Sequence, residues 1–189
     1  NNSVSVALTV TQANSVISSL PSASSITYGQ NLSSSTLSGG AGSPSGGSFS
    51  FTNTNYVPSA GTASQSITYT PLDTNNYNSA TASISVVVNQ AKPIITWSSV
   101  SSIVYGTTIG SSILNTTNSV VGTFNYSTNT GKVVQNGTLL GAGTYTLNEG
   151  FLPADTVNYT TNNSLYVNLT VAKATPVVTW NTISPIVYG

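Results

Sequence analysis

Apolar and polar residues alternate along several stretches of the chain, and this alternation is the first indication of its fold. Before Val171, the residues Leu165, Val167 and Leu169 alternate with polar or aromatic neighbours. The same pattern runs from residue 4 to 10 and from 84 to 88. Successive side chains of a β-strand point to opposite faces, so we expect strands here, each with one face in a core. No stretch shows helical spacing.

The other apolar runs are short and rich in Val, Ile, Thr, Tyr and Phe, with Gly, Pro, Asn and Ser between them. That composition is typical of strands joined by turns. A period of about 80 residues contains six or seven such runs, which is enough for a small antiparallel sandwich of the immunoglobulin-like kind. We therefore expect an all-β chain of tandem immunoglobulin-like β-sandwich domains in a linear array.

Internal repetition supports the tandem organisation. The pentapeptide SITYG, ending at Gly29, returns as SIVYG ending at Gly106 and as PIVYG ending at Gly189. In the same order, GSFSF, AGT and PLDTNNY of the first period match GTFNY, AGT and PADTVNY of the second, and QAKPIITW matches KATPVVTW. Several landmarks in one order at one period are the signature of a repeat protein. The landmark residues are Tyr28, Gly29, Asp73, Tyr77, Trp97, Tyr105, Gly106, Asp155, Tyr159, Trp180, Tyr188 and Gly189.

The landmarks also place the domain boundaries. The first ten residues, NNSVSVALTV, align without gaps on NNSLYVNLTV at 162–171. We therefore expect residues 1–11 to be the closing strand of a preceding repeat, 12–90 to be the first repeat and 91–172 the second. Residues 173–189 are then the opening strands of a following repeat.

Two landmarks predict local geometry. Glycine after tyrosine, as at positions 29 and 106, is expected to end a strand where the backbone needs positive φ or a close approach. Asp73 and Asp155 precede Asn-Tyr at a spacing that suits an Asx turn. The aromatic residues are expected to fill the two cores: Tyr28, Phe49, Phe51 and Tyr77 in the first, and Trp97, Tyr105, Phe124, Tyr126, Phe151 and Tyr159 in the second.

Charge is nearly absent from this chain. It contains three Lys or Arg residues, three Asp or Glu residues and no His, so its formal net charge is zero. Without a basic stripe, binding to nucleic acid or to an anionic membrane surface is not expected, and no membrane insertion is expected either. Because so few groups titrate, we also expect the stability to change little between pH 2 and pH 7.

The same scarcity argues against catalysis. Acid–base catalysis needs titratable groups brought together, and the six charged residues are scattered. A Ser-Lys dyad, a calcium site at a repeat junction and a Lys-Asn isopeptide crosslink at Lys92 remain open, but no motif supports them. We therefore expect no enzyme activity, no cofactor and no metal.

Sequons provide the remaining chemical signal. Asn-x-Ser/Thr occurs at eight positions, which a chain this rich in Asn, Ser and Thr produces partly by chance. If used, they would carry glycans on a secreted surface and supply the hydration that charge does not. The possible N-glycosylation sites are Asn1, Asn31, Asn115, Asn125, Asn136, Asn158, Asn162 and Asn168.

The combined unit resembles a known family. The resemblance rests on an alternating strand that follows five motifs in order: Ala-x-Pro-x-x-Thr-Trp, Ile-x-Tyr-Gly, Gly-x-Phe-x-Tyr, Ala-Gly-Thr and Pro-x-Asp-x-x-Asn-Tyr. The unit is similar to the bacterial and archaeal immunoglobulin-like repeat called MBG, in its YGX type. The resemblance implies tandem repeats of large extracellular, cell-surface proteins, many of them adhesin-like, without shared catalytic residues. The first unit departs from it, because QANSVISSL stands where the others have Ala-x-Pro and Trp.

Three functions fit this sequence. The first is a structural segment of an extracellular cell-surface stalk or fibre, in which neighbouring repeats are the partners. The second is the subunit of a surface filament, in which residues 162–189 of one chain occupy, by strand addition, the pairing position of residues 1–29 in an identical neighbour. The third is a carbohydrate-binding or host-binding adhesin module with exposed aromatic residues and a groove.

Overall fold

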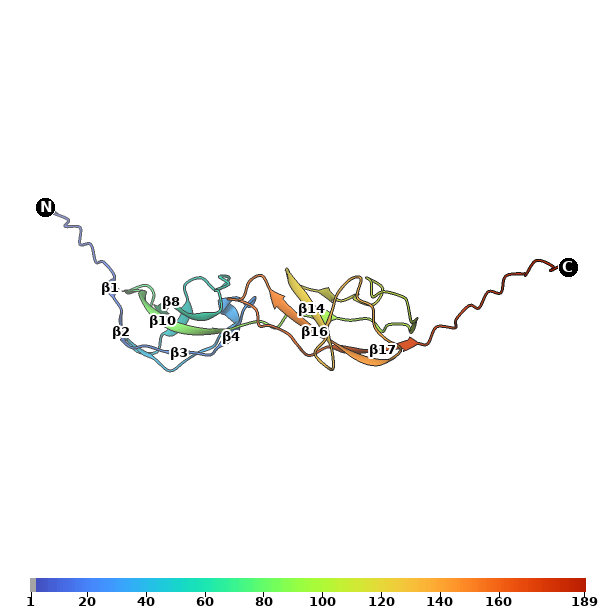
Figure 1. Cartoon of the computed structure of the whole chain (residues 1–189). Coiled ribbons are helices and arrows are strands. Elements are labelled where there is room, and N and C mark those ends of the chain that lie inside the picture. The colour runs from blue at the N-terminus through green and yellow to red at the C-terminus, as the bar shows by residue number, and fades with distance from the viewer. Residues whose placement is uncertain (1–2) are drawn as a thin grey trace. The chain divides into compact units, whose positions relative to one another are not determined.

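A computed structural model describes residues 3–189 and shows an all-β chain (Figure 1). The helical structure in the described residues is a single short 3-10 turn, Leu32–Ser34. The chain forms two compact units. The first contains Asn1–Pro93 together with Pro153–Thr160, and the second contains Ile94–Leu152 with Thr161–Gly189.

The main sheet of the first unit has four strands. Their order is β4 (Ile26–Thr27), β10 (Ala80–Asn89), β8 (Gly61–Thr70) and β7 (Ser48–Phe51). The pair β4–β10 is parallel, whereas β10–β8 and β8–β7 are antiparallel. Short pairs complete the unit: β1 (Ala13–Asn14) with β9 (Tyr77–Asn78), β2 (Val16–Ser19) with β6 (Ala41–Ser43), and β3 (Ser22–Ala23) with β5 (Leu37–Ser38).

The second unit has a five-stranded main sheet. Its order is β12 (Ile103–Val104), β17 (Tyr166–Ala172), β16 (Gly143–Pro153), β14 (Gly122–Thr128) and β15 (Val133–Val134). The pair β12–β17 is parallel and the following pair, β17–β16, is antiparallel. A separate pair joins β11 (Ile95–Thr96) to β13 (Thr117–Asn118).

The first four strands of the second sheet follow the order of the first sheet, and the second sheet adds β15 at its edge. Ile26 pairs with Val88 in the first unit, and Ile103 pairs with Val171 in the second. The alternation predicted from sequence explains the long strands: on β10 the side chains of Ile84, Val86 and Val88 are buried, while Ser85 and Val87 between them are exposed. Burying one face of each sheet supplies most of the driving force for folding.

Each unit has its own core, made mainly of aliphatic side chains. The buried residues of the first are Ile26, Leu32, Phe51, Ile67, Ile84, Val86 and Val88. Those of the second are Ile109, Ile113, Val134, Leu140, Leu147, Leu169 and Val171.

The aromatic predictions were partly wrong. Phe51 and Phe151 are buried, and Tyr28, Phe49, Trp97 and Tyr126 pack against the cores. Tyr105, however, is 50% exposed, and Tyr159 lies against Tyr28 in the first unit instead of in the second core. The largest fully buried side chain is Tyr69, which the repeat pattern did not single out.

The predicted strand at residues 3–10 does not form. Its apolar residues Val4, Val6, Leu8 and Val10 are all more than four-fifths exposed, and no strand is assigned before Ala13. Residues 173–189 likewise form no strand, and Trp180 and Tyr188 are exposed. A strand needs a neighbour for its backbone hydrogen bonds, and neither segment is paired with one among residues 3–189.

A glycine beside a buried aromatic ring recurs in both units. A Cβ added to Gly47 would collide with the Tyr69 ring and the Thr70 carbonyl oxygen. A Cβ added to Gly122 would meet the Phe151 ring and the Leu152 carbonyl oxygen in the same way. The Tyr69 hydroxyl also donates to the Pro44 carbonyl and accepts from the Gly47 amide at 3.0 Å. Glycine at this landmark therefore lets the strand edge approach the ring.

We predict that Gly122→Ala lowers the free energy of unfolding by about 1–3 kcal/mol, because the added methyl overpacks the site. Gly110→Ala is the matched control in the same unit, since its Cβ would come no closer than 3.8 Å to Asn136 Oδ1. Equilibrium urea unfolding measures both variants. Equal stability of the two variants would contradict the packing role.

Candidate interaction site

The loop Pro-x-Asp-Thr-x-Asn-Tyr forms the same turn in both of its copies, as the sequence predicted. Asp73 Oδ1 accepts from the amides of Asn75 and Asn76 at 3.1 and 3.2 Å, and Asp73 Oδ2 accepts from the Asn76 side chain at 2.7 Å. Asp155 makes the corresponding three bonds to Val157 and Asn158, at 3.2, 3.0 and 2.7 Å. These are Asx turns, which fix the loop without help from the rest of the fold.

The two aspartates are held in the ionised form by this turn. The hydrogen bond from the Asn76 side chain lowers the pKa of Asp73, and the bond from the Asn158 side chain does the same for Asp155. Backbone amides add to both effects. The carboxylates therefore act as turn caps, and their acceptor sites are taken up by the loop itself.

A glutamine-alanine linker lies along each loop. In the first copy, Gln12 Nε2 donates to the Thr74 carbonyl at 2.7 Å and the Ala13 amide donates to the Asn76 carbonyl at 2.8 Å. In the second copy, Gln90 Nε2 donates to the Thr156 carbonyl at 2.8 Å and the Ala91 amide donates to the Asn158 backbone carbonyl at 2.9 Å. Each linker thus forms a short parallel pair with the loop that follows it about 65 residues later.

The loop at 153–160 makes further contacts within the first unit. Asn158 Oδ1 accepts from the Ala60 amide at 2.8 Å. The Tyr159 ring meets the Tyr28 ring edge to face, with centroids 5.4 Å apart and planes at 84°. Asn158 is 9% exposed and its side-chain amide is bonded at both ends. We define Tyr28, Ala60, Asn158 and Tyr159 as the joint.

The other copy of the loop has no such contacts. Asn76 repeats the bond to its aspartate, but its Oδ1 has no hydrogen-bond partner among residues 3–189, and the side chain is exposed. Tyr77 has no aromatic partner within the described part of the chain. One loop is therefore docked and the other is free.

Glu149 is the one buried charged residue of the described chain. It lies on β16, is 3% exposed, and neither carboxyl oxygen has a hydrogen-bond partner there. Burial raises its pKa, because the ionised carboxylate loses solvation and the backbone at Leu165 offsets this only in part. Burial also raises the pKa of Tyr126, which lies in the same unit. Glu149 is separate from the loop aspartates, and residues 3–189 contain no cluster of His, Cys, Asp or Glu able to hold a metal ion.

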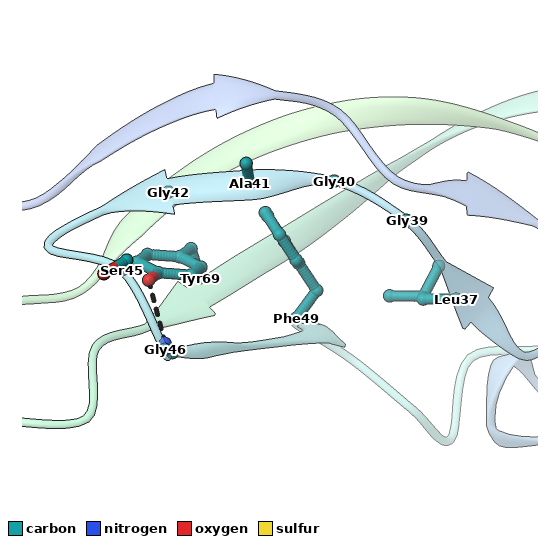
Figure 2. Close-up of a pocket in the computed structure, with 10 residues that line it drawn as sticks. Leu37, Gly39, Gly40, Ala41, Gly42, Ser45, Gly46, Phe49 and Tyr69 are labelled. Atoms are coloured by element: carbon teal, nitrogen blue, oxygen red, sulfur yellow. Dashed lines mark hydrogen bonds between the residues drawn. The ribbon is translucent and has the colours of Figure 1, made fainter.

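A cavity of about 320 Å³ lies under the glycine-rich hairpin that includes Gly40 and Gly42 (Figure 2). Figure 2 shows the rings of Phe49 and Tyr69 on its floor, and their centroids are 5.0 Å apart. Tyr69 is only 1% exposed and its hydroxyl is already bonded, so it offers no face for a sugar to stack on. This cavity reflects packing of glycines around a core ring.

The sequons differ in accessibility. Asn1 lies outside the described residues. Asn125, Asn136 and Asn168 are exposed, whereas Asn31, Asn115 and Asn162 are half-buried. Asn158 does not fit glycosylation in the folded chain, because its side chain is 9% exposed and its Nδ2 donates to Asp155.

The structure places the remaining landmarks in two groups. Gly29 and Gly106 have φ of 92° and 102°, which confirms the predicted positive φ after tyrosine. Trp180, Tyr188 and Gly189 lie in the exposed segment outside any strand. No helix among the described residues has the length and apolar character needed to cross a membrane.

Sequence reasoning found the loop, the linker and the Ala-Gly-Thr landmark, but it did not connect them. Their recurrence at one period was the available signal. That signal does not show that the Ala60 amide lies opposite Asn158, 98 residues away.

A scan against protein-family models found no match, and a search of curated proteins found none either.

We predict that Asn158→Ala destabilises the chain more than Asn76→Ala does, by about 1–2 kcal/mol. Both substitutions remove the same bond to aspartate, so the difference reports the contact of Asn158 Oδ1 with the Ala60 amide. Urea unfolding followed by circular dichroism measures the two variants. Equal losses would show that the joint contributes nothing to stability.

The pKa shifts predict two opposing pH effects on stability. The aspartates stabilise the fold above their usual pKa of 3.8, and this contribution is lost as pH falls through their lowered folded values. Glu149 destabilises the fold as pH rises from 4.5 through its raised folded value. Because the two effects oppose each other, the unfolding temperature of the wild-type chain should differ less between pH 2 and pH 7 than that of variants that keep only one of them.

Variants separate the two effects. Glu149→Gln leaves only the aspartate contribution, so this variant should unfold at a higher temperature at pH 7 than at pH 2. Asp73→Asn with Asp155→Asn leaves only Glu149, and the order should reverse. Thermal unfolding by circular dichroism at both pH values measures this. If Glu149→Gln keeps the wild-type pH response, the proposed balance is wrong.

Proposed function

We propose that this chain is a structural segment of an extracellular cell-surface stalk or fibre built from tandem immunoglobulin-like repeats. The observation that carries the proposal is the joint. The loop 153–160 follows β16, a strand of the second unit's sheet, yet it packs within the first unit against Tyr28 and Ala60. The joint therefore makes a loop of the second sequence period part of the first compact unit.

The linker supports the same reading. Pro93 is buried and Ala91 is half-buried, so this part of the linker is packed within the first unit. Proline fixes φ, and Gln90 and Ala91 are bonded to the following loop, which lowers the conformational entropy of the passage. A fibre gains stiffness when its junctions are ordered in this way.

The joint also suits an exposed location. It consists of neutral hydrogen bonds, an aromatic pair and short strand pairing, none of which weakens with salt as a surface ion pair does. The carboxylates near it are turn caps with lowered pKa values. Such a junction keeps its contacts over a wide range of pH and ionic strength outside a cell.

The segment at 3–10 favours a second candidate, the subunit of a filament formed by strand addition. Its apolar residues are exposed, and its sequence aligns on the segment 164–171 that contains most of β17. An identical chain with an open sheet edge would cover it. The mass of the native material under denaturing conditions separates the candidates: a single polypeptide far above 19.3 kDa indicates a covalent array, and a chain near 19.3 kDa apart from any glycan indicates a filament of subunits.

We predict that the two units of the wild-type chain tumble together in solution. Amide ¹⁵N relaxation should give one rotational correlation time for both. Asn158→Ala with Tyr159→Ala should release the joint and give the units separate, shorter correlation times. The matched control, Asn76→Ala with Tyr77→Ala, changes the free loop and should leave the common correlation time intact. Independent tumbling of the two wild-type units would contradict the stalk proposal.

A further inference from the structure

The second unit ends in a surface built from the same landmarks as the joint. Tyr105, Ala142, Lys173 and Ala174 line a cavity of about 380 Å³. In the repeat alignment these residues correspond to Tyr28, Ala60, Gln90 and Ala91 of the first unit. In the first unit the equivalent surface is occupied by the loop 153–160.

The backbone around the two surfaces is the same. The Tyr28 amide donates to the Asn89 carbonyl, and the Tyr105 amide donates to the Ala172 carbonyl, both at 2.8 Å. Gly61, next to Ala60, pairs with Val88, and Gly143, next to Ala142, pairs with Val171. The Ala142 amide and the Tyr105 ring are therefore presented as Ala60 and Tyr28 are.

The two surfaces differ in whether a loop covers them. Tyr28 and Ala60 are half-buried under the docked loop, whereas Tyr105 is 50% exposed and Ala142 is exposed. Pro93 is buried in the joint, and its counterpart Pro176 is exposed. The second unit thus offers an amide donor and an aromatic ring that lack a partner among residues 3–189.

The free loop of the first unit carries the complementary groups. Asn76 is locked by Asp73 as Asn158 is locked by Asp155, and this leaves its Oδ1 available as an acceptor. Tyr77 follows it as Tyr159 follows Asn158. Because the Asx turn fixes the loop in advance, docking costs little conformational entropy.

We propose that the surface of Tyr105 and Ala142 binds the loop 71–78 of a second copy of this chain placed after it in an array. In the contact, Asn76 Oδ1 of the second copy accepts from the Ala142 amide, and Tyr77 packs edge to face on Tyr105. Lys173 and Ala174 take the places of Gln12 and Ala13, with Lys173 Nζ donating to the Thr74 carbonyl. This inference rests on the proposed stalk function and identifies the groups that continue the array.

A tandem chain tests the contact. Residue 174 of a first copy is followed directly by residue 14 of a second, because Ala174 and Ala13 occupy the same repeat position. Amide hydrogen exchange by NMR is then measured for Ala142 of the first copy, with the unlinked chain as the baseline. We expect exchange of this amide to slow by about tenfold, as expected for a new hydrogen bond of ordinary strength.

Variants in the tandem chain identify the loop as the occupant. Asn76→Ala in the second copy should return Ala142 to its baseline exchange rate, and Tyr105→Ala in the first copy should do so in part while leaving the loop unchanged. Asn75→Ala is the matched control, since the Asn75 side chain makes no hydrogen bond to the described residues, and it should have no effect. The Tyr77 amide, which is bonded to the Asp73 carbonyl, reports whether each variant loop remains folded.

The outcomes separate this inference from the proposed function. Slow exchange of the Ala60 amide with unchanged exchange of Ala142 in the tandem chain overturns the inference and leaves the joint intact. Fast exchange of both amides contradicts the stalk proposal itself. Protection of Ala142 that persists in Asn76→Ala also overturns the inference, because another group then covers the amide. Protection that grows with concentration in the unlinked chain supports the same contact between separate copies.

Discussion

The hydrogen bond from the Ala60 amide to Asn158 Oδ1 is the interaction on which the organisation of this chain depends. It joins residues 98 positions apart and places a loop of the second sequence period inside the first compact unit. The bond is possible because Asp155 already holds the Asn158 side-chain nitrogen, which turns its oxygen outward as an acceptor. Local turn chemistry thus prepares a long-range contact.

A chain with six charged residues relies on neutral interactions throughout. Its stabilising polar contacts are strand pairing and hydrogen bonds of Ser and Thr hydroxyls and asparagine amides. For instance, the Thr52 hydroxyl forms hydrogen bonds with the hydroxyls of Ser66 and Thr68 on β8. Each such bond is modest, but neither salt nor moderate pH removes it. Glu149 is the exception, and its raised pKa records the cost of burying a carboxyl without a partner.

Repetition makes the two ends of the chain complementary. The first unit keeps a free loop with Asn76 and Tyr77, and the second keeps a free surface with Tyr105 and Ala142. The segment 3–10 likewise leaves the side chains of Val4, Val6, Leu8 and Val10 exposed. In the proposed array, these exposed residues would acquire partners when copies of the chain follow one another.

The sequence alone determined the features that depend on neighbours a few residues apart: the strand alternation of β10 and β17, the Asx turns at Asp73 and Asp155, and the positive φ of Gly29 and Gly106. It also predicted the all-β class, because strand periodicity and turn residues act locally. Only the tertiary structure decided that Tyr69 fills a core, that Tyr159 leaves the second unit's core, and that Asn158 is a buried acceptor and not an open sequon. These outcomes depend on contacts between residues that are far apart in the sequence. A repeated motif has the same sequence whether its surface is covered or exposed, so the sequence alone does not show which copy is covered.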